Sequence, residues 1–117
     1  MDSAMEIKDA GYRVWYDAPQ QTVWFEGTLR LSTGEFAPIS ELLAAVAAND
    51  PGRLTLDMRG LKFLNSSGIN TLYKFAISLR KRGDIQLVVR SANDIGWQAK
   101  SLPNLKRFLP AVQIEAG

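Results

Sequence analysis

Asn65-Ser66-Ser67-Gly68 is the stretch that decides the fold, because it joins an apolar strand to an amphipathic helix. The strand before it reads LTLDM at residues 54–58 and continues as LKFL at residues 61–64. The helix after it begins near Ser67 and repeats apolar residues at i, i+3, i+4 and i+7, the spacing of a helix packed on a sheet. Its apolar face comprises Ile69, Leu72, Tyr73, Ala76 and Leu79. This junction predicts an α/β domain.

The two serines at the start of this helix have two interpretations. A hydroxyl there can cap backbone N–H groups that lack a partner within the helix. It can also carry a phosphate, which the positive end of the helix dipole stabilises. Taken alone, a pair of serines at a helix start favours capping. The choice between capping and phosphorylation therefore depends on features elsewhere in the chain.

The composition excludes most catalytic chemistry. The chain has no His and no Cys, which removes Ser-His-Asp and Cys-His catalysis and Cys/His zinc sites. It contains neither a Gly-x-x-x-x-Gly-Lys-Ser/Thr loop nor a Gly-x-Gly-x-x-Gly motif after a strand. Its seven Asp and five Glu form no recognisable pair. We therefore expect no enzyme, no metal site and no cofactor.

Length and hydropathy indicate one soluble domain over residues 1–117. A chain of 117 residues can form a single core, and no linker, repeat or low-complexity tract divides it. No apolar run approaches the roughly 20 residues of a membrane-spanning helix. Residues 1–6 lack the basic and apolar segments of a signal peptide. The absence of Cys agrees with a reducing compartment, so we expect a cytoplasmic protein without membrane insertion.

Charge is distributed unevenly along the chain. Residues 1–58 carry four Lys/Arg and nine Asp/Glu, whereas residues 59–117 carry ten Lys/Arg and three Asp/Glu. Arg80, Lys81 and Arg82 fall in the last turn of the predicted helix, where cations complement the dipole. A nucleic-acid surface calls for a denser basic stripe with exposed aromatic residues, so we expect no nucleic-acid partner. A solvated surface and a charged protein partner both fit this pattern.

The remaining segments predict alternating strands and helices. Pro19 marks the turn of a hairpin, Pro38 the first turn of a helix, and Gly83 the end of the central helix. Asp94 is a candidate cap for the helix that follows it. In chain order we expect strands at 12–16 and 21–31, a helix at 38–48, a strand at 53–58, a helix at 67–81, a strand at 85–89, helices at 95–100 and 105–109, and a strand at 112–114. Because helices separate the later strands, part of the sheet must be parallel. We predict a mixed sheet of four or five strands, with the strand at 53–58 central and helices on one face or both.

These residues resemble the core of STAS domains, the fold of bacterial anti-sigma factor antagonists. The resemblance rests on LTLDMRGLKFLNSSGINTL at residues 54–72, on the Gly-terminated helix after it and on IQLVV at residues 85–89. VWFEGTL at residues 23–29 matches the second strand of the family, with its Gly-x-Leu ending. The order of elements agrees from about Gly11 to Ile114.

The resemblance implies a phosphorylation switch. In the family, the first Ser of Asp-Ser-Ser-Gly accepts phosphate from a partner that is both a serine kinase and an anti-sigma factor, and the dephosphorylated protein binds that partner. Carried over, the phosphoacceptor is Ser66, with Ser67 as the alternative. We expect the partner-binding surface to lie on the solvent side of the helix, with an exposed Phe75 among its contacts. The expected contact residues are Asn65, Gly68, Asn70, Thr71, Lys74 and Phe75.

Two residues depart from the family pattern. Asn65 replaces the acid before the serines, and Arg30 replaces the acid that commonly follows Gly-x-Leu. Both changes remove negative charge from the region that a kinase would recognise. A phosphorylation-independent STAS subunit or scaffold, for example of a lipid ABC transporter, is therefore the second hypothesis. An anion- or nucleotide-binding sensor is the third.

Two further features have a structural and a functional interpretation. Trp15, Trp24 and Trp97 would form a ligand box if they met, but aromatic residues on strands and amphipathic helices usually pack. Asp57 can bind the loop before Ser66 or act as a structural acid of its strand, and we favour the structural role.

Overall fold

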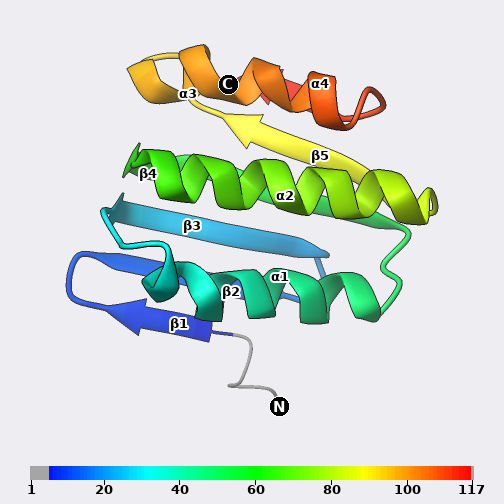
Figure 1. Cartoon of the computed structure of the whole chain (residues 1–117), viewed down its shortest axis with the longest axis horizontal. Coiled ribbons are helices and arrows are strands. Elements are labelled where there is room, and N and C mark those ends of the chain that lie inside the picture. Colours follow the sequence, from blue (N-terminus) through cyan, green and yellow to red (C-terminus); the bar gives the residue numbers. More distant parts are fainter. Residues whose placement is uncertain (1–5, 117) are drawn as a thin grey trace.

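The sheet has six strands, and their order in space follows their order in the sequence (Figure 1). The computed structural model describes residues 6–116. The strands are β1 (Glu6–Asp9), β2 (Tyr12–Asp17), β3 (Thr22–Leu29), β4 (Arg53–Leu64), β5 (Gln86–Ser91) and β6 (Gln113–Ala116). The predicted α/β domain with a mixed sheet is confirmed. The prediction missed β1, whose sequence Glu-Ile-Lys-Asp holds one apolar residue among charges.

The sheet is antiparallel at one side and parallel at the other. β1, β2 and β3 pair antiparallel, while β3 to β6 pair parallel. β4 is longer than predicted and runs through Gly60 to Leu64, with register shifts against β3. It lies third from one edge of the sheet and fourth from the other, which confirms its central position.

All helices cover the same face of the sheet (Figure 1). They are α1 (Ala37–Ala48), α2 (Ser66–Arg82), α3 (Gly96–Ser101) and α4 (Leu105–Phe108), with 3₁₀ turns at Gly34–Phe36 and Leu102–Asn104. The parallel strands advance across the sheet in one direction, and crossovers share one hand, so each connection returns over the same face. The predicted cap of α3 is wrong, because its N-cap is Ile95 and no side chain caps the helix.

The core lies between this helix layer and the sheet. Its strand side chains include Val14, Val23, Leu56 and Val89, all at most 1% exposed. α2 contributes the predicted stripe: Leu72, Ala76 and Leu79 are buried, and Ile69 and Tyr73 are partly buried against the core. Burying apolar area at about 25 cal/mol per Å² makes this layer the main source of stability.

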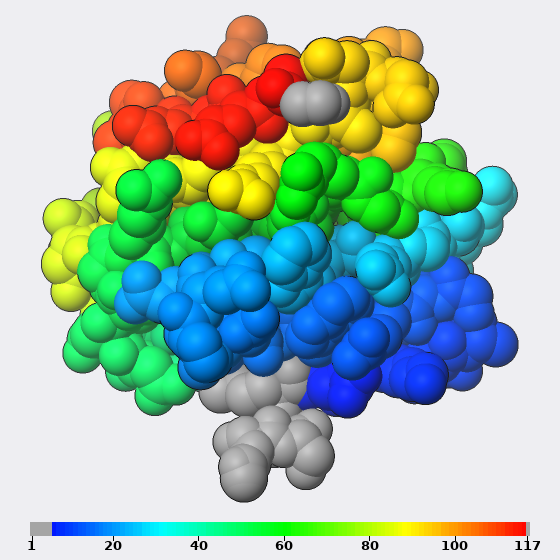
Figure 2. Space-filling view, turned by 180° about the vertical axis from the view of Figure 1, so that it is seen from behind, coloured from blue at the N-terminus to red at the C-terminus, as the bar shows by residue number. Residues whose placement is uncertain are grey.

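The other face of the sheet carries no helix among residues 6–116 (Figure 2). The strand register places one residue from each strand in a single row across this face: Glu6, Trp15, Trp24, Asp57, Arg90 and Glu115. Trp15 and Trp24 stack with ring centroids 6.1 Å apart, and the Arg13 guanidinium lies 3.8 Å from the Trp15 ring centre. Trp97 lies on α3 instead and donates its indole N–H to the Leu61 carbonyl, so the three tryptophans form no common box.

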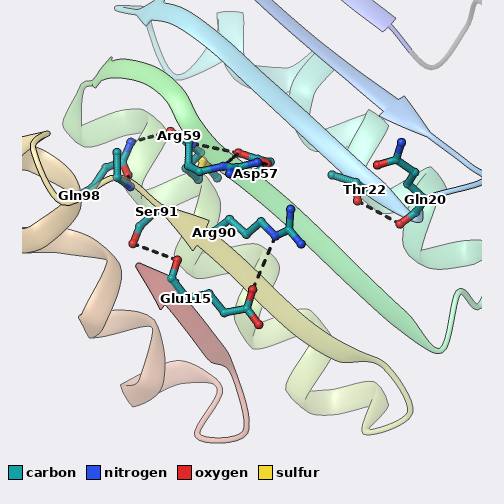
Figure 3. Close-up of polar contacts among 10 residues, drawn as sticks. Gln20, Thr22, Asp57, Arg59, Arg90, Ser91, Gln98 and Glu115 are labelled. Atoms are coloured by element: carbon teal, nitrogen blue, oxygen red, sulfur yellow. Dashed lines mark hydrogen bonds and ion pairs between the residues drawn. The ribbon is translucent and has the colours of Figure 1, made fainter. Parts of the chain in front are cut away.

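Two buried polar side chains hold the middle of the sheet (Figure 3). Asp57 accepts hydrogen bonds from Arg59 on both carboxylate oxygens, and these bonds raise the pKa of Arg59. Gln98 accepts from the Ala92 N–H and donates to the Met58 and Leu61 carbonyls. Asp57 therefore has the structural role that we favoured, although its partner is Arg59 and not the loop before Ser66.

Candidate functional site

Asn65 ties the start of α2 to the end of β3. Its side-chain oxygen accepts from the Gly68 N–H at 3.2 Å, which caps the helix. Its side-chain amide donates to the Leu31 carbonyl at 2.8 Å, and its backbone N–H donates to the Leu29 carbonyl at 3.2 Å. Three hydrogen bonds from one residue fix the direction in which α2 leaves the sheet.

Ser66 is the first residue of α2, which begins one residue earlier than the start near Ser67 that we expected. The side chain is exposed, and its hydroxyl forms no hydrogen bond with any of residues 6–116. Ser67 is half-buried, and its Oγ lies 3.3 Å from the Thr33 Oγ1. The two serines therefore differ: one hydroxyl is accessible at the helix N-terminus, and the other already has a partner.

Gly68 is buried and has a packing role. A Cβ at this position would lie 2.7 Å from Cζ of Phe36 and would overlap the Leu64 side chain. The absence of a side chain thus lets the first turn of α2 approach the core closely. The expectation that Gly68 belongs to the exposed contact surface is corrected, because its neighbours cover it.

The remaining expected contacts divide between the surface and the core. Asn70 and Lys74 are exposed, and Thr71 is half-buried with its hydroxyl donating to the Ser67 carbonyl at 2.9 Å. Phe75 is only 8% exposed and belongs to the core. The prediction of an exposed Phe75 is wrong, because α1 packs beside α2 and brings Leu43 and Ala44 next to this position.

A shallow apolar hollow lies between α1 and α2, one turn beyond the serines. Its volume is about 260 Å³, and Phe75 forms part of its wall. The lining residues are Ser40, Leu43, Ala44, Thr71, Lys74, Phe75 and Ser78. The contribution of α1 was not predicted from the sequence. Its signal is the pair Ser40 and Ala44, two small residues spaced i and i+4 on one face of a helix, which leave room for a hollow there.

Ile77 is a second feature of the surface that was not predicted from the sequence. It is 37% exposed, the one large hydrophobic side chain exposed to this degree within residues 6–116. It follows Lys74 by three positions, so the two side chains are neighbours on the outer surface of α2. Ile77 lies outside the apolar stripe of α2, and this position is the sequence signal that it is exposed.

The charges near Ser66 are mixed. Arg30 is exposed, with its guanidinium 4.3 Å from the Phe63 ring centre. Glu35 accepts from the Ser32 N–H at 2.8 Å, and this bond, assisted by the Ser32 hydroxyl, lowers the pKa of Glu35. α2 itself contains no Asp or Glu. An anion on Ser66 would thus face the N-terminal end of the helix dipole, which stabilises negative charge.

Across residues 6–116, no three His, Cys, Asp or Glu side chains gather in a way that would hold a metal ion. None of the helices there has the length and apolar character needed to cross a membrane.

Comparison with known proteins gives a family match and several similar structures. The family model described as STAS domain matches residues 22–98. No curated protein matches the chain by sequence. Apo-SiaC from Pseudomonas aeruginosa superposes with a TM-score of 0.68 at 16% identity, covering 95% of this chain and 98% of SiaC.

Two further structures share the fold. One is a chain from the complex of the diguanylate cyclase SiaD with its activator SiaC from Pseudomonas aeruginosa, with a TM-score of 0.67 at 16% identity and coverage of 96% of this chain and 98% of that chain. The other is an anti-sigma factor antagonist from Mycobacterium paratuberculosis, with a TM-score of 0.59 at 20% identity, covering 92% of this chain and 81% of that protein.

Proposed function

This chain belongs to the STAS domain family, and from that premise we propose that it is a cytoplasmic protein-interaction regulator that switches partners through phosphorylation of Ser66. The dephosphorylated form binds its partner through the surface that begins at Ser66 and continues along α2. Phosphorylation changes the charge of that surface and releases the partner.

The observation that supports this proposal is the difference between the two serines. The Ser66 hydroxyl is exposed and is not needed as a cap, because Asn65 already caps the helix. A phosphate there adds about −1.5 to −2 charges at the favourable end of the dipole. The domain can therefore accept the phosphate without unfolding, so the modification acts on binding.

We propose as partner an anti-sigma factor with serine kinase activity, as the family resemblance implies. The structural likeness to SiaC, the activator of a diguanylate cyclase, adds an enzyme as a second partner class to be tested. In both cases the partner binds the same surface of α2.

A second candidate function is a phosphorylation-independent subunit or scaffold of a larger complex, such as a lipid ABC transporter. It is favoured by Asn65 and Arg30, which stand where the family has acids. In this function Ser66 contributes a contact surface and never a phosphate.

The experiment that tests the switch is affinity capture from native lysate with phosphosite mapping, using Ser66→Ala and Ser66→Asp variants. We expect phosphate on Ser66 of the wild-type protein, constitutive partner binding by Ser66→Ala, and weak binding by Ser66→Asp. Both variants should unfold within about 0.5 kcal/mol of the wild type, because the exposed hydroxyl makes no bond to protein.

Ser67→Ala is the matched control, since it removes the neighbouring hydroxyl and leaves Ser66 in place. It should keep both the phosphate and the switch. Phosphate mapped to Ser67, or equal partner binding by all the proteins, would rule out the Ser66 switch and leave the phosphorylation-independent function.

A further inference from the structure

The helix layer beyond the serines is basic without interruption. α2, α3 and α4 contain no Asp or Glu, and their cations are Lys74, Arg80, Lys81, Arg82, Lys100, Lys106 and Arg107. These helices lie side by side, because the rings of Tyr73 and Phe108 meet at 4.8 Å and the Tyr73 hydroxyl donates to the Ser101 carbonyl (Figure 1). Seven of the ten Lys and Arg residues between 59 and 117 thus lie on this helix layer, and the other three lie on β4 and β5.

Most of this charge has no ion-pair partner among residues 6–116. Arg82 is engaged by Asp50 and Asp84. Lys74, Arg80 and Lys81, by contrast, form no ion pair with any other residue between 6 and 116. Lys74 and Lys81 are both exposed and stand seven positions apart, two turns along the same side of α2.

Apolar surface lies directly beside these lysines. Lys74 itself lines the hollow between α1 and α2, together with Leu43, Ala44 and Phe75. Ile77, which neighbours Lys74 on the surface of α2, adds an exposed apolar side chain. On the other side of the hollow, α1 offers one charged residue, Glu41, which follows Ser40 and so points about 100° away from it around the helix.

An apolar hollow with Lys74 in its wall and Lys81 two turns further along the same helix matches an amphipathic segment whose polar side is acidic. We propose that the partner of this surface is such an acidic amphipathic helix, which places an apolar side chain between α1 and α2 and its carboxylates against Lys74 and Lys81. This inference rests on the proposed function, because it names the chemistry of the partner that the switch controls.

The sign of the switch follows from this partner chemistry. Ser66 lies two turns before Lys74, about 12 Å along the helix axis. A phosphate there repels the carboxylates of an acidic partner over a distance comparable to the Debye length of about 8 Å in physiological salt. A basic partner would instead be attracted, and phosphorylation would then strengthen the complex. Asn65 and Arg30 agree with the acidic partner, since each removes an acid that would repel it.

Membranes and nucleic acids fit this surface less well. A membrane surface favours a helix with a broad apolar face, whereas Ile77 stands alone as an exposed large hydrophobic residue in the described chain. Single-stranded nucleic acid favours exposed aromatic platforms, whereas Tyr73 and Phe108 pack against each other.

The test is an NMR titration of the full-length, unphosphorylated protein with a designed amphipathic peptide. The peptide has Leu at i, i+3, i+4 and i+7 and Glu on its polar side, and the control peptide has Lys in place of every Glu. We expect the Glu peptide alone to shift the resonances of residues 40–44 and 71–78. Its affinity should fall at least about fivefold in Lys74→Glu, because one ion pair becomes a repulsive contact.

Arg53→Glu is the matched charge reversal, because Arg53 is exposed at the start of β4, outside the helix layer. It should leave the affinity unchanged. Ser66→Asp should lower the affinity of the protein for the Glu peptide, and the decrease should be larger in low salt than in high salt. Preference for the Lys peptide, equal binding of both peptides, no shift, or shifts confined to the open sheet face would each overturn the proposal.

Two further probes separate this inference from its alternatives and from the switch itself. Binding to phosphatidylserine vesicles or to single-stranded DNA that is lost in Lys74→Glu, without binding of the Glu peptide, would replace the protein partner by that ligand. Binding of the Glu peptide by a protein that is never phosphorylated in cells would uphold the partner chemistry and refute the phosphorylation switch.

Discussion

At the scale of single residues, Asn65 shows why this chain departs from the acid of its family. An amide offers both an acceptor and a donor, whereas a carboxylate only accepts. Both groups are used, the oxygen by the Gly68 N–H and the amide by the Leu31 carbonyl. The replacement thus keeps the cap of α2 and adds a bond to the segment after β3.

This assignment predicts an order of stability for two variants. Asn65→Ala should lower the free energy of unfolding by about 1–2 kcal/mol, because it removes the cap and the bond to Leu31. Asn65→Asp should lower the free energy of unfolding by a smaller amount, since the carboxylate keeps the cap but places an oxygen against the Leu31 carbonyl. Urea denaturation measures both changes. An Asn65→Asp protein as stable as the wild type would show that the bond to Leu31 contributes nothing.

At the scale of elements, the sequence predicts the sheet-facing side of α2 and misses the side that meets α1. The stripe from Ile69 to Leu79 has the period of a helix on a sheet, and the structure buries it. Phe75 falls outside that stripe and is buried in the core, next to Leu43 and Ala44 of α1. A helix that packs on a sheet and also against a neighbouring helix buries more of its circumference than one apolar stripe. The sequence of α2 alone does not show where α1 lies, so this second buried side could not be predicted from it. The same limit hides the hollow, whose two walls come from different helices.

The arrangement of α2 predicts which of its substitutions unfold the protein. Leu72→Ala should cost about 2–5 kcal/mol, as expected for a buried large-to-small change. Phe75→Asp should lower the melting temperature markedly, because it buries a carboxylate without a partner.

Ile77→Asp is the control for this prediction, since it places the same carboxylate on the outer surface two positions away. It should change stability by no more than about 0.5 kcal/mol. Circular dichroism melts of the three variants give the comparison. A Phe75→Asp protein that melts like Ile77→Asp would mean that α1 does not cover this side chain.

At the scale of the whole molecule, Arg82 closes the end of the fold opposite Ser66. It donates to the Ala47 carbonyl at 2.7 Å and pairs with Asp50 and Asp84, which joins the end of α1, the end of α2 and the start of β5. From the sequence, Arg82 is predicted only to complement the helix dipole, because its partner Asp50 lies 32 residues earlier. The failed cap at Asp94 has a similar cause: the packing of α3 on the sheet is set by Gln98 and Trp97, whose bonds reach β4.

This closure predicts a loss of stability in acid. Hydrogen bonds from Arg82 lower the pKa of Asp84 below its ordinary value of 3.8. A lowered folded-state pKa contributes stability above the unfolded pKa, and this contribution is lost as the pH falls through the folded value. The free energy of unfolding should therefore decline below about pH 4, and Asp84→Asn and Arg82→Met should each make that decline shallower. Urea denaturation between pH 5 and 2 measures the slopes. Wild-type slopes in both variants would exclude this pair as a source of acid sensitivity.

The sequential strand order has a consequence for protein engineering. Residue 6 begins the strand at one border of the sheet, and residue 116 ends the strand at the opposite border. Five strand spacings of about 4.8 Å put these borders roughly 24 Å apart, so a circular permutation would need at least about eight extended residues in all between residue 116 and residue 6. A fluorophore or an affinity tag attached at either position would therefore lie at an edge of the sheet. The helix layer and the helix-free face of the sheet would both stay accessible in a binding assay.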